Sequence, residues 1–173
     1  MYLPSDAPRA VPLLPQLENA VSFDYLYHVN GTISIFWADV TLDTIFRVEV
    51  TGKTASNPRP IVSTGLSTVE GIAVDWISEV IYWTDSHHDH IQVAKIDGLM
   101  RATVVKGEIH NPRDIVVDPR SDTVHTVTYD GRDHVEVLRD HVFSTHPFSV
   151  DLFENYVYWT DWRINAIVRC SKR

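Results

Sequence analysis

The sequence predicts an all-β fold, an incomplete β-propeller built from four-stranded antiparallel blades. Three tetrads, residues 36–39, 82–85 and 158–161, each consist of an aromatic residue, Trp, a small residue and Asp. A glycine stands thirteen residues after the first two of these aspartates, at Gly52 and Gly98. Apolar runs that end in Asp75 and Asp118 lie 43 residues apart. Such a period in a β-rich sequence is typical of one propeller blade, which has about 40 to 45 residues.

The second repeat supplies the four strands of one blade. Residues 72–74, 81–84, 90–96 and 102–105 are the predicted strands A, B, C and D. These runs are short and rich in β-branched and aromatic residues. The third run alternates imperfectly between apolar and polar residues, as a partly covered sheet would. Asp97-Gly98 then supplies a tight turn into the fourth strand.

Four aspartates end similar apolar runs and set the register of the repeats: Asp24, Asp75, Asp118 and Asp151. In the third repeat Asp118 fills two positions. It ends strand A when counted from Asp75, and it takes the place of the tetrad aspartate when counted back from Gly131. We therefore expect a strand to be missing near residues 118–123. Residues 115–117 would serve as strand B of a blade without strand A, or this blade would be disordered.

Two segments divide the chain. Residues 1–16 are a Pro-rich N-terminal segment, and residues 17–173 contain the repeats. The glycine expected thirteen residues after Asp161 falls beyond Arg173, so the last blade is expected to lack strand D. The single cysteine, Cys170, leaves no internal disulfide. The repeats hold between three and four blades.

The tetrad Tyr82-Trp83-Thr84-Asp85 resembles the class B (YWTD) repeats of the low-density lipoprotein receptor family. Residues 71–76, 111–113, 146–148 and 158–162 are also similar to that consensus, so the resemblance spans most of residues 17–169. The match is most similar to the large endocytic LDL receptor-related proteins. The resemblance implies a propeller of six blades, so the chain would be a receptor fragment, a splice product or an incomplete gene model.

The resemblance also implies a function, a set of partners and a location. It implies a non-enzymatic extracellular module of an endocytic receptor that supports ligand binding and acid-dependent ligand release. The implied partners are protein ligands, neighbouring EGF-like and LDL-receptor class A modules of a parent receptor, and an ER chaperone for YWTD propellers. The implied location is the extracellular or endosomal side of a membrane receptor.

Composition narrows the partners further. The net charge of −8, without a Lys/Arg run, argues against nucleic acid and against contact of this segment with an anionic membrane. No apolar stretch approaches the ~18 residues needed to span a bilayer. Residues 1–16 have no basic start and their apolar part is broken by prolines, so neither a signal peptide nor a transmembrane segment is expected in this chain.

The tetrad residues are expected to be structural, with the tryptophans filling space between blades and the aspartates accepting backbone hydrogen bonds at turns. They are Phe36, Trp37, Asp39, Tyr82, Trp83, Asp85, Tyr158, Trp159 and Asp161. No nucleophile elbow, phosphate-binding loop or paired-carboxylate motif is seen, so no catalytic or cofactor-binding residue is predicted.

Asn30 is the predicted glycosylation site. It begins the sequon Asn30-Gly31-Thr32, in a hairpin that has fifteen residues from Asp24 to Asp39 where later repeats have ten. This predicts an insertion of five residues in an exposed loop. The alternative is a chance tripeptide that is never modified.

Five histidines lie in predicted loops at the end of the blades opposite the Asn30 hairpin. The pH-sensing candidates are His87, His88, His90, His110 and His146. Residues 87–90 suggest a metal site, but the tract lacks the spacing of a helical zinc motif and a matching cysteine or carboxylate set. Solvated loop histidines are the favoured interpretation, and no metal site is predicted.

Two alternatives to a receptor module remain open. A calcium-dependent propeller hydrolase would need Asp, Asn or Glu from several blades to converge on the central axis. The other alternative, a truncated product without autonomous function, requires no functional residues in this chain.

Overall fold

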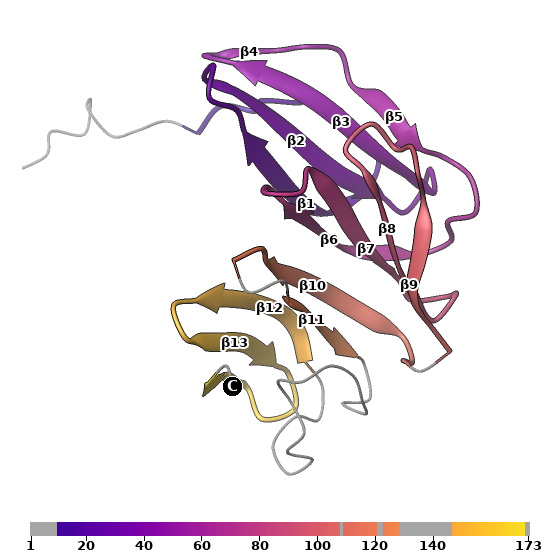
Figure 1. Cartoon of the computed structure of the whole chain (residues 1–173), viewed down its shortest axis with the longest axis vertical. Coiled ribbons are helices and arrows are strands. Elements are labelled where there is room, and N and C mark those ends of the chain that lie inside the picture. Colours follow the sequence, from indigo (N-terminus) through magenta and orange to yellow (C-terminus); the bar gives the residue numbers. More distant parts are fainter. Residues whose placement is uncertain (1–9, 108, 121–122, 129–146, 172–173) are drawn as a thin grey trace, which may run out of the picture.

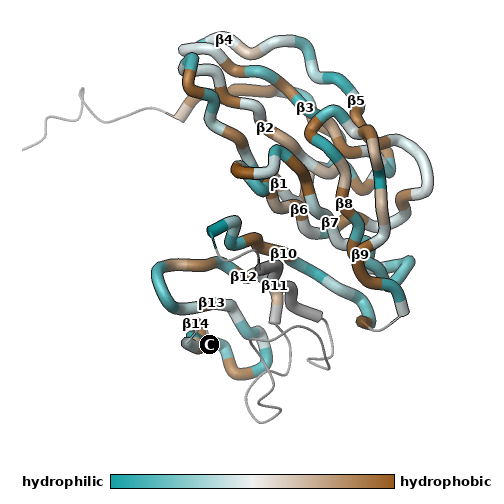
Figure 2. Tube along the Cα trace, in the orientation of Figure 1, coloured by the Kyte–Doolittle hydropathy of each residue, from teal (hydrophilic) through white to brown (hydrophobic). Residues whose placement is uncertain are grey.

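The computed structural model describes residues 10–107, 109–120, 123–128 and 147–171. Every regular element in these ranges is a β-strand, and all strand pairs are antiparallel. The strands form four successive sheets, the blades, which follow one another in chain order (Figure 1). Apolar residues lie along the strands, whereas many connecting turns are hydrophilic (Figure 2). The predicted all-β fold with antiparallel blades in an incomplete propeller is confirmed.

Blade 1 is a five-stranded sheet. Its strands are β1 (Ala20–Tyr27), β2 (Thr32–Asp39), β3 (Thr44–Thr51), β4 (Thr54–Ala55) and β5 (Arg59–Val62). The first four pair in chain order, and β5 pairs with β3 beyond the short β4. β4 and β5 together therefore occupy the place of strand D.

Blade 2 is the four-stranded meander that the sequence predicts. Its strands, in order of pairing, are β6 (Val69–Asp75), β7 (Val80–Asp85), β8 (His90–Lys95) and β9 (Ala102–Lys106). Gly98 turns the chain between β8 and β9 with φ +85°, and a Cβ at this position would collide with the carbonyl oxygen of Ile61. Glycine is therefore required both by the turn and by the contact of blade 2 with β5.

Blade 3 corrects the prediction of a missing strand near residues 118–123. β10 (Pro112–Asp118) pairs with β11 (Thr123–Thr128) in an antiparallel hairpin. Ile115 is opposite Thr126, as Ile72 is opposite Trp83 in blade 2, and β10 packs against β6. β10 is therefore strand A and β11 is strand B, so residues 115–117 are not strand B.

Strand B of blade 3 was not predicted because other residues occupy its tetrad positions. His125, Thr126, Val127 and Thr128 stand where an aromatic residue, Trp, a small residue and Asp stand in blade 2. Val150 follows Ile115 by 35 residues, whereas Ile115 follows Ile72 by 43. The shortening therefore falls after strand B, among residues 129–146, which lie outside the described residues.

Blade 4 has three strands in the described residues. They are β12 (Pro147–Phe153), β13 (Tyr156–Asp161) and β14 (Ala166–Ser171), paired in chain order. Phe153 is opposite Tyr156, so the turn between β12 and β13 holds only Glu154 and Asn155.

The register of the sheets corrects the alignment of the four aspartates. Asp24 is opposite Phe36, one residue from the tetrad Trp, and Asp151 is opposite Tyr158 in the same way. Asp75 lies two positions further along strand A. Asp24 and Asp151 therefore do not end strand A.

The same register shortens the insertion in the first hairpin. Leu26 takes the position of Asp75, because each lies three residues after the partner of a tetrad Trp. Counted from Leu26 to Asp39 the interval is thirteen residues, against ten from Asp75 to Asp85. The insertion is therefore three residues, and the prediction of five is wrong.

Strand A of each blade packs against strand A of the next. β6 contacts β1 and β10, and β10 contacts β12. A separate apolar core fills each boundary between blades: Leu26, Phe36 and Trp83 between blades 1 and 2; Ala73, Ile91 and Ile115 between blades 2 and 3; Val116, Val150 and Trp159 between blades 3 and 4. In the part of the chain that is described, no helix has the length and apolar character to cross a membrane.

Candidate functional site

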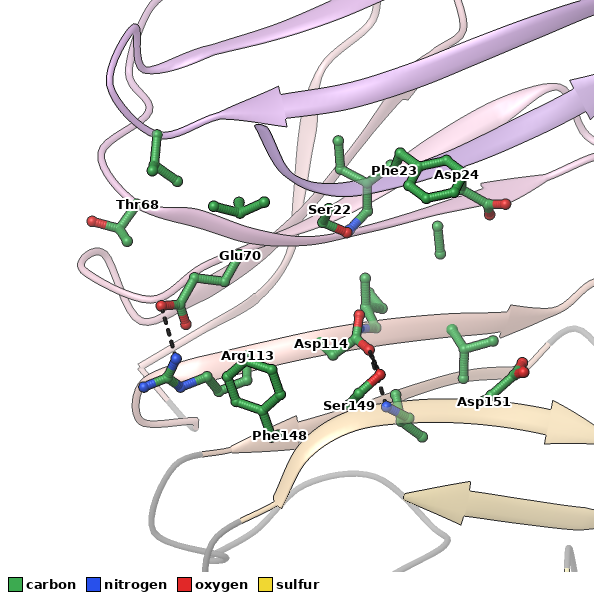
Figure 3. A pocket seen from close by; sticks show the side chains of 17 residues that line it. Ser22, Phe23, Asp24, Thr68, Glu70, Arg113, Asp114, Phe148, Ser149 and Asp151 are labelled. Carbon is green, nitrogen blue, oxygen red and sulfur yellow. Dashed lines mark hydrogen bonds and ion pairs between the residues drawn. The ribbon is translucent and has the colours of Figure 1, made fainter. Parts of the chain in front are cut away.

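A cavity of about 510 Å³ lies where strands A of the four blades meet. Strands β1, β6, β10 and β12 all contribute to its wall. Its polar and aromatic lining includes Ser22, Asp24, Glu70, Arg113, Asp114, Phe148, Ser149 and Asp151 (Figure 3). This is the position of a propeller axis. In a closed propeller, residues from several blades would contact a ligand bound there.

Two side chains of β1 bind the backbone of β6 across the first blade boundary. The hydroxyl oxygen of Ser22 accepts from the backbone N–H of Ile72 at 3.1 Å. Asp24 Oδ2 accepts from the N–H of Val74 at 2.7 Å, and its Oδ1 accepts from the N–H of Tyr25 at 2.8 Å. Asp24 is therefore engaged in holding blades 1 and 2 together.

Asp114 repeats this arrangement between blades 3 and 4. Its Oδ2 accepts from the N–H of Val150 and from the hydroxyl of Ser149, each at 3.0 Å. Its position on strand A corresponds to that of Ser22, because each immediately precedes the residue opposite the tetrad position of Trp. Asp24 and Asp114 thus act first as acceptors for backbone groups of the next blade.

Burial perturbs these carboxyl groups. Desolvation raises the pKa of Asp24 and of Asp114 above the ordinary value, although backbone hydrogen bonds act in the opposite direction. The negative charge of Asp151 adds to the rise at both residues. The axis therefore holds carboxyl groups in a poorly solvated environment, where they repel one another.

At Gly71 the inner strands of blades 2 and 3 meet without a side chain between them. A Cβ on Gly71 would lie 2.8 Å from the carbonyl oxygen of Arg113 and 2.9 Å from the nitrogen of Ile115. Thr84 Oγ1 accepts from the N–H of Gly71 at 2.9 Å and donates to the carbonyl of Arg113 at 2.7 Å. The absence of a side chain at residue 71 lets the two strands approach this closely.

An aromatic and arginine group borders the cavity. The rings of Phe148 and Trp162 stack with centroids 4.5 Å apart, and the guanidinium of Arg113 lies 5.6 Å from the Phe148 ring centroid. Arg113 also pairs with Glu70 at 3.2 Å. Phe148 is 42% exposed and Trp162 is 62% exposed. Phe148, Trp162 and Arg113 all lie in segments that resemble the repeat consensus, but the sequence did not predict that they meet, since they come from blades 3 and 4.

The tetrad aspartates accept backbone hydrogen bonds in all three blades that have them. Asp39 Oδ1 accepts from Thr41 and Leu42, and Asp161 Oδ1 accepts from Arg163 and Ile164. Both oxygens of Asp85 are also occupied, as described below. These groups secure the turn after strand B.

The tetrad aromatics are buried in different surroundings. Trp83 is fully buried in the core between blades 1 and 2, and Trp159 is buried between blades 3 and 4. Trp37 stacks on Phe46 at 5.3 Å, and Leu14 of the N-terminal segment packs against their cluster. Phe36 is also in the first core, Tyr82 packs against the second, and Tyr158 contacts Tyr156. The face of blade 1 that carries Trp37 is thus covered in part by the segment that precedes the repeats.

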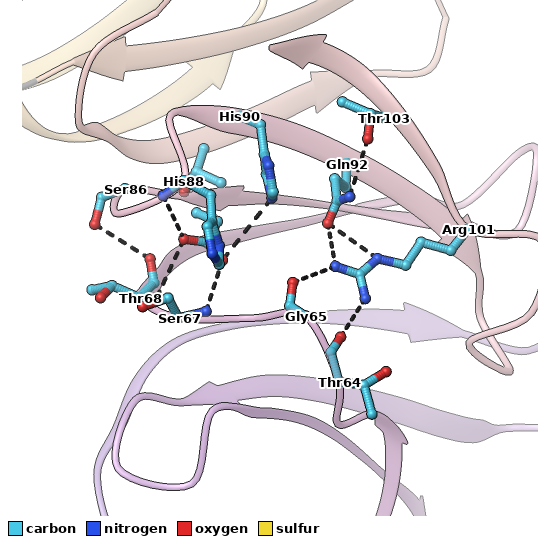
Figure 4. A network of polar contacts seen from close by, with 12 residues as sticks. Thr64, Gly65, Ser67, Thr68, Ser86, His88, His90, Gln92, Arg101 and Thr103 are labelled. Carbon is cyan, nitrogen blue, oxygen red and sulfur yellow. Dashed lines mark hydrogen bonds and ion pairs between the residues drawn. The ribbon is translucent and has the colours of Figure 1, made fainter. Parts of the chain in front are cut away.

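Three of the five candidate histidines lie together. His88 Nδ1 is 2.9 Å from Asp85 Oδ2, and the rings of His88 and His90 stack at 5.3 Å (Figure 4). The His87 ring lies 5.6 Å from that of His88. His110 stands apart, 3.5 Å from Asp89 Oδ2. The candidate His146 lies outside the described residues.

The surroundings of this cluster set its protonation. Burial lowers the pKa of His90, against the attraction of Asp85. Burial alone would raise the pKa of Asp85, but hydrogen bonds from His88 and from the backbone of Ser67 and Thr68 hold it below the ordinary value. The cluster therefore combines a neutral imidazole with a carboxylate. The sequence showed no matching carboxylate set for a metal at these histidines, whereas in the structure Asp85 supplies a carboxylate beside them.

Asn30 lies in the exposed turn between β1 and β2. Its Oδ1 accepts from the N–H of Thr32 at 2.9 Å, and Gly31 has φ +83°. The amide nitrogen of Asn30, to which a glycan would be attached, is therefore on an accessible turn.

Comparisons with known proteins agree with the repeat assignment. A family model described as low-density lipoprotein receptor repeat class B matches residues 79–119. Low-density lipoprotein receptor-related protein 5 of Mus musculus is 30% identical over 148 residues, which is 84% of this chain. The chain spans only 7% of the length of that relative.

Solved structures share the fold. A chain of the nidogen/laminin complex aligns with a TM-score of 0.62 and 21% identity, over 88% of this chain and 76% of that chain. A luciferin-regenerating enzyme aligns at 0.56 and 13% identity, over 86% and 60% of the two chains. Regucalcin from Agrobacterium tumefaciens, a calcium-binding protein, aligns at 0.54 and 10% identity, over 87% and 62%.

Sequence and fold agree on one assignment. The chain is an incomplete YWTD β-propeller, and its repeats are low-density lipoprotein receptor class B repeats of the kind found in LDL receptor-related proteins.

Proposed function

We propose that the chain is a non-enzymatic extracellular module of an LDL receptor-related endocytic receptor and that it binds protein ligands. The observation that carries the proposal is the 30% identity to an LDL receptor-related protein over 84% of this chain. The cavity favours a binding role over a catalytic one because Asp24 and Asp114 are occupied by backbone N–H groups. In the proposed parent receptor the module would lie on the extracellular or endosomal side of a membrane.

The ligand surface is the end of the blades that carries Phe148, Trp162 and Arg113. Aromatic residues and arginine dominate the binding energy of protein interfaces, and here they form one stacked, partly exposed group. Protein ligands are the proposed occupants. The EGF-like and class A modules of a parent receptor and an ER chaperone for YWTD propellers are further proposed partners of the module.

Binding of the labelled chain to serum proteins and to cell surfaces tests this proposal. We expect saturable binding that Trp162→Ala weakens about tenfold or more, as loss of an interface anchor does. Trp76→Ala is the matched control, since Trp76 is 49% exposed in the turn between β6 and β7, at the opposite end of the blades. Absence of saturable binding would favour the alternative of a product without autonomous function.

Acid-dependent ligand release is the second part of the proposal. His87, His88 and His110 lie in turns at the same end of the blades as Trp162. Burial lowers the pKa of His90, the charge of Asp85 opposes this shift, and the charges of Arg101 and Lys106 add to it. Asp89 faces His110. Protonation of several histidines between neutral and endosomal pH would add positive charge to this end.

The test compares ligand binding at neutral and endosomal pH, in EDTA, for the wild type and the triple variant H87Q/H88Q/H90Q. We expect the wild type to lose more affinity on acidification than the variant does. Equal losses would remove these three histidines from the release mechanism.

A calcium-dependent hydrolase is the second candidate. It is favoured by the gathering of Asp24, Asp114 and Asp151 around the axis, and two of the structural neighbours are an enzyme and a calcium-binding protein. Likeness at 10 to 13% identity shows the fold alone. Moreover, within the described ranges the only group of three or more His, Cys, Asp or Glu ligand atoms within 4.8 Å of one another lies elsewhere. Ester hydrolysis that appears with added calcium and disappears in Asp114→Asn would support this candidate.

A further inference from the structure

Asp85, His88 and His90 bring three donor atoms to one point at the junction of β7 and β8. Asp85 ends β7, His90 begins β8, and His88 lies in the turn between them. One carboxylate oxygen and two imidazole nitrogens lie within 4.8 Å of one another. Asp85 and His90 are directly opposite each other in the sheet, so the ladder fixes their separation.

His90 gives this cluster an unused ligand atom. Its side chain is nine-tenths buried, and Nε2 has no hydrogen-bond partner in the described part of the chain. This nitrogen lies 4.0 Å from Asp85 Oδ2, beyond hydrogen-bond reach. A buried imidazole nitrogen aimed at a carboxylate without bonding to it is satisfied by a cation placed between the two.

We propose that Asp85, His88 and His90 bind a divalent transition-metal ion, with Zn²⁺ as the representative. Two imidazole nitrogens and one carboxylate oxygen form a three-ligand set that leaves a fourth position for water. Calcium prefers six to eight oxygen ligands and does not match this set. The proposal is independent of the proposed ligand binding and goes beyond it.

The geometry needs only small adjustments. Zn²⁺ binds nitrogen and oxygen at about 2.0 to 2.2 Å, which places tetrahedral ligand atoms about 3.3 to 3.5 Å apart. His88 Nδ1 and Asp85 Oδ2 are 2.9 Å apart, and His90 Nε2 and Asp85 Oδ2 are 4.0 Å apart. The His88 side chain is 41% exposed, so its ring is free to shift by the required fraction of an ångström.

The remaining contacts of Asp85 are compatible with a metal ion. Its Oδ1 accepts from the N–H groups of Thr68 and His88, which leaves the metal to Oδ2. Oδ2 also accepts from the N–H of Ser67 at 2.9 Å, a contact that orients a ligating carboxylate. The bound ion would therefore link the turn after β7 to the segment that leads into β6.

The nearby arginine is directed away from the proposed ion. Arg101 donates to the side chain of Gln92 and to the carbonyl oxygens of Thr64 and Gly65. Figure 4 shows Arg101 and Gln92 on one side of His90, with His88 on the other. The guanidinium of Arg101 is thus engaged with these groups and forms no hydrogen bond with Asp85 or His90 among those described.

Calorimetric titration of the untagged, metal-free chain with ZnCl₂ tests the site. We expect one ion per chain, and we expect His88→Gln and His90→Gln each to weaken binding about tenfold or more, because even loss of an outer partner costs that much. His87→Gln and His110→Gln are matched controls that keep wild-type affinity. His88 carries the test alone should the His90 variant unfold, because His88 is exposed.

A thermal midpoint provides the second measurement. At a hundredfold excess of Zn²⁺ over Kd we expect the midpoint to rise by about 5 °C or more in the wild type and in His87→Gln, and not in His88→Gln. Failure of the wild type to bind Zn²⁺, or unchanged binding by His88→Gln, would overturn the proposal. Neither result bears on protein-ligand binding measured in EDTA, so the two proposals fail separately.

Discussion

Asp24 Oδ2 accepts a hydrogen bond from the backbone N–H of Val74 at 2.7 Å, across the boundary between blades 1 and 2. The same carboxylate accepts from the N–H of Tyr25. A single side chain thus pairs a backbone group that no strand ladder satisfies and fixes the offset between the inner strands of two blades.

Replacement of Asp24 by alanine is expected to lower the free energy of unfolding by about 1 to 3 kcal/mol, because it leaves the buried N–H of Val74 without its partner. Urea denaturation measures the change. Glu18→Ala removes the same charge from an exposed position and should change stability by less than about 0.5 kcal/mol. Equal effects of the two substitutions would show that the contact across the blades contributes nothing.

The same residue predicts a pH dependence. Burial raises the pKa of Asp24 above its ordinary 3.8, so on acidification the folded chain takes up this proton before the unfolded chain does. The contribution of Asp24 to the free energy of unfolding therefore rises as the pH falls through the folded pKa and levels off below 3.8. The stability of the wild type relative to Asp24→Asn should increase in the same interval.

Asp85 provides the opposite sign. Its pKa is held below 3.8 by the hydrogen bonds that outweigh burial, so its contribution is lost as the pH falls below 3.8 through the folded value. Unfolding measured from neutral pH to below 3.8 separates the two. A difference between the wild type and Asp24→Asn that shrinks on acidification would contradict the assignment of Asp24.

The sequence predicted the blades well and their inner contacts poorly. In blade 2 the last three strands were predicted to within one residue at each end, because the tetrad, the turn glycine and the strand runs all agree there, whereas β6 begins three residues earlier than predicted. Blade 3 was misread because Thr126 stands where blade 2 has Trp83, and a pairing register is set by tertiary contacts as well as by residue type. Asp24, Asp75 and Asp151 look equivalent in the sequence because each follows an apolar run. Their positions differ because the hairpins between strands A and B differ in length, so that Asp75 ends strand A whereas Asp24 and Asp151 line the axis.

The candidate sites show the same limit. The three histidines at residues 87–90 were visible in the sequence, but the carboxylate that completes their cluster belongs to a motif with a structural role of its own. Phe148 and Trp162 come from two strands' ends and meet only because blade 4 folds. The spacing of these residues along the chain does not predict that their side chains come into contact.

Gly71→Ala is expected to destabilise the chain. Substitution of glycine by alanine in a strand ordinarily helps, by about 0.4 to 1 kcal/mol where the backbone allows it. Here the added Cβ would lie 2.8 Å from the carbonyl oxygen of Arg113, and backbone atoms cannot rotate away. We expect a loss of about 1 to 3 kcal/mol from overpacking between blades 2 and 3. Urea denaturation measures the change in the free energy of unfolding. A gain in stability would contradict the prediction and would mean that blades 2 and 3 move apart without cost to admit the Cβ.

Glycosylation of Asn30 is predicted for chain that passes through a secretory pathway. Its turn is exposed, and Thr32 completes the sequon. Thr32→Ala should abolish the shift in electrophoretic mobility that peptide N-glycosidase removes from the wild type. Thr32→Ser keeps the sequon and serves as the control. A wild type without such a shift would leave the tripeptide as an unmodified turn.

The outward face of β1 predicts self-association. Alternate residues of this strand, Val21, Phe23, Tyr25 and Tyr27, are 47%, 69%, 56% and 64% exposed. In the described residues β1 pairs only with β2, so it also presents an unpaired edge. In the boundaries that the structure shows, the corresponding faces of inner strands are covered by the preceding blade. We therefore expect light scattering to show a mass that rises with protein concentration.

Charge placed on this face should reduce the association. The double variant Tyr25→Lys, Tyr27→Lys puts two ammonium groups where another apolar surface would have to desolvate them. The matched control is Val104→Lys, on the outer strand β9, where the side chain is 50% exposed and lies apart from β1. We expect the double variant to be monomeric at concentrations at which the wild type and the control associate. A monomeric wild type would show that the aromatic face of β1 is tolerated in water, and equal association of all three proteins would place the contact on another surface.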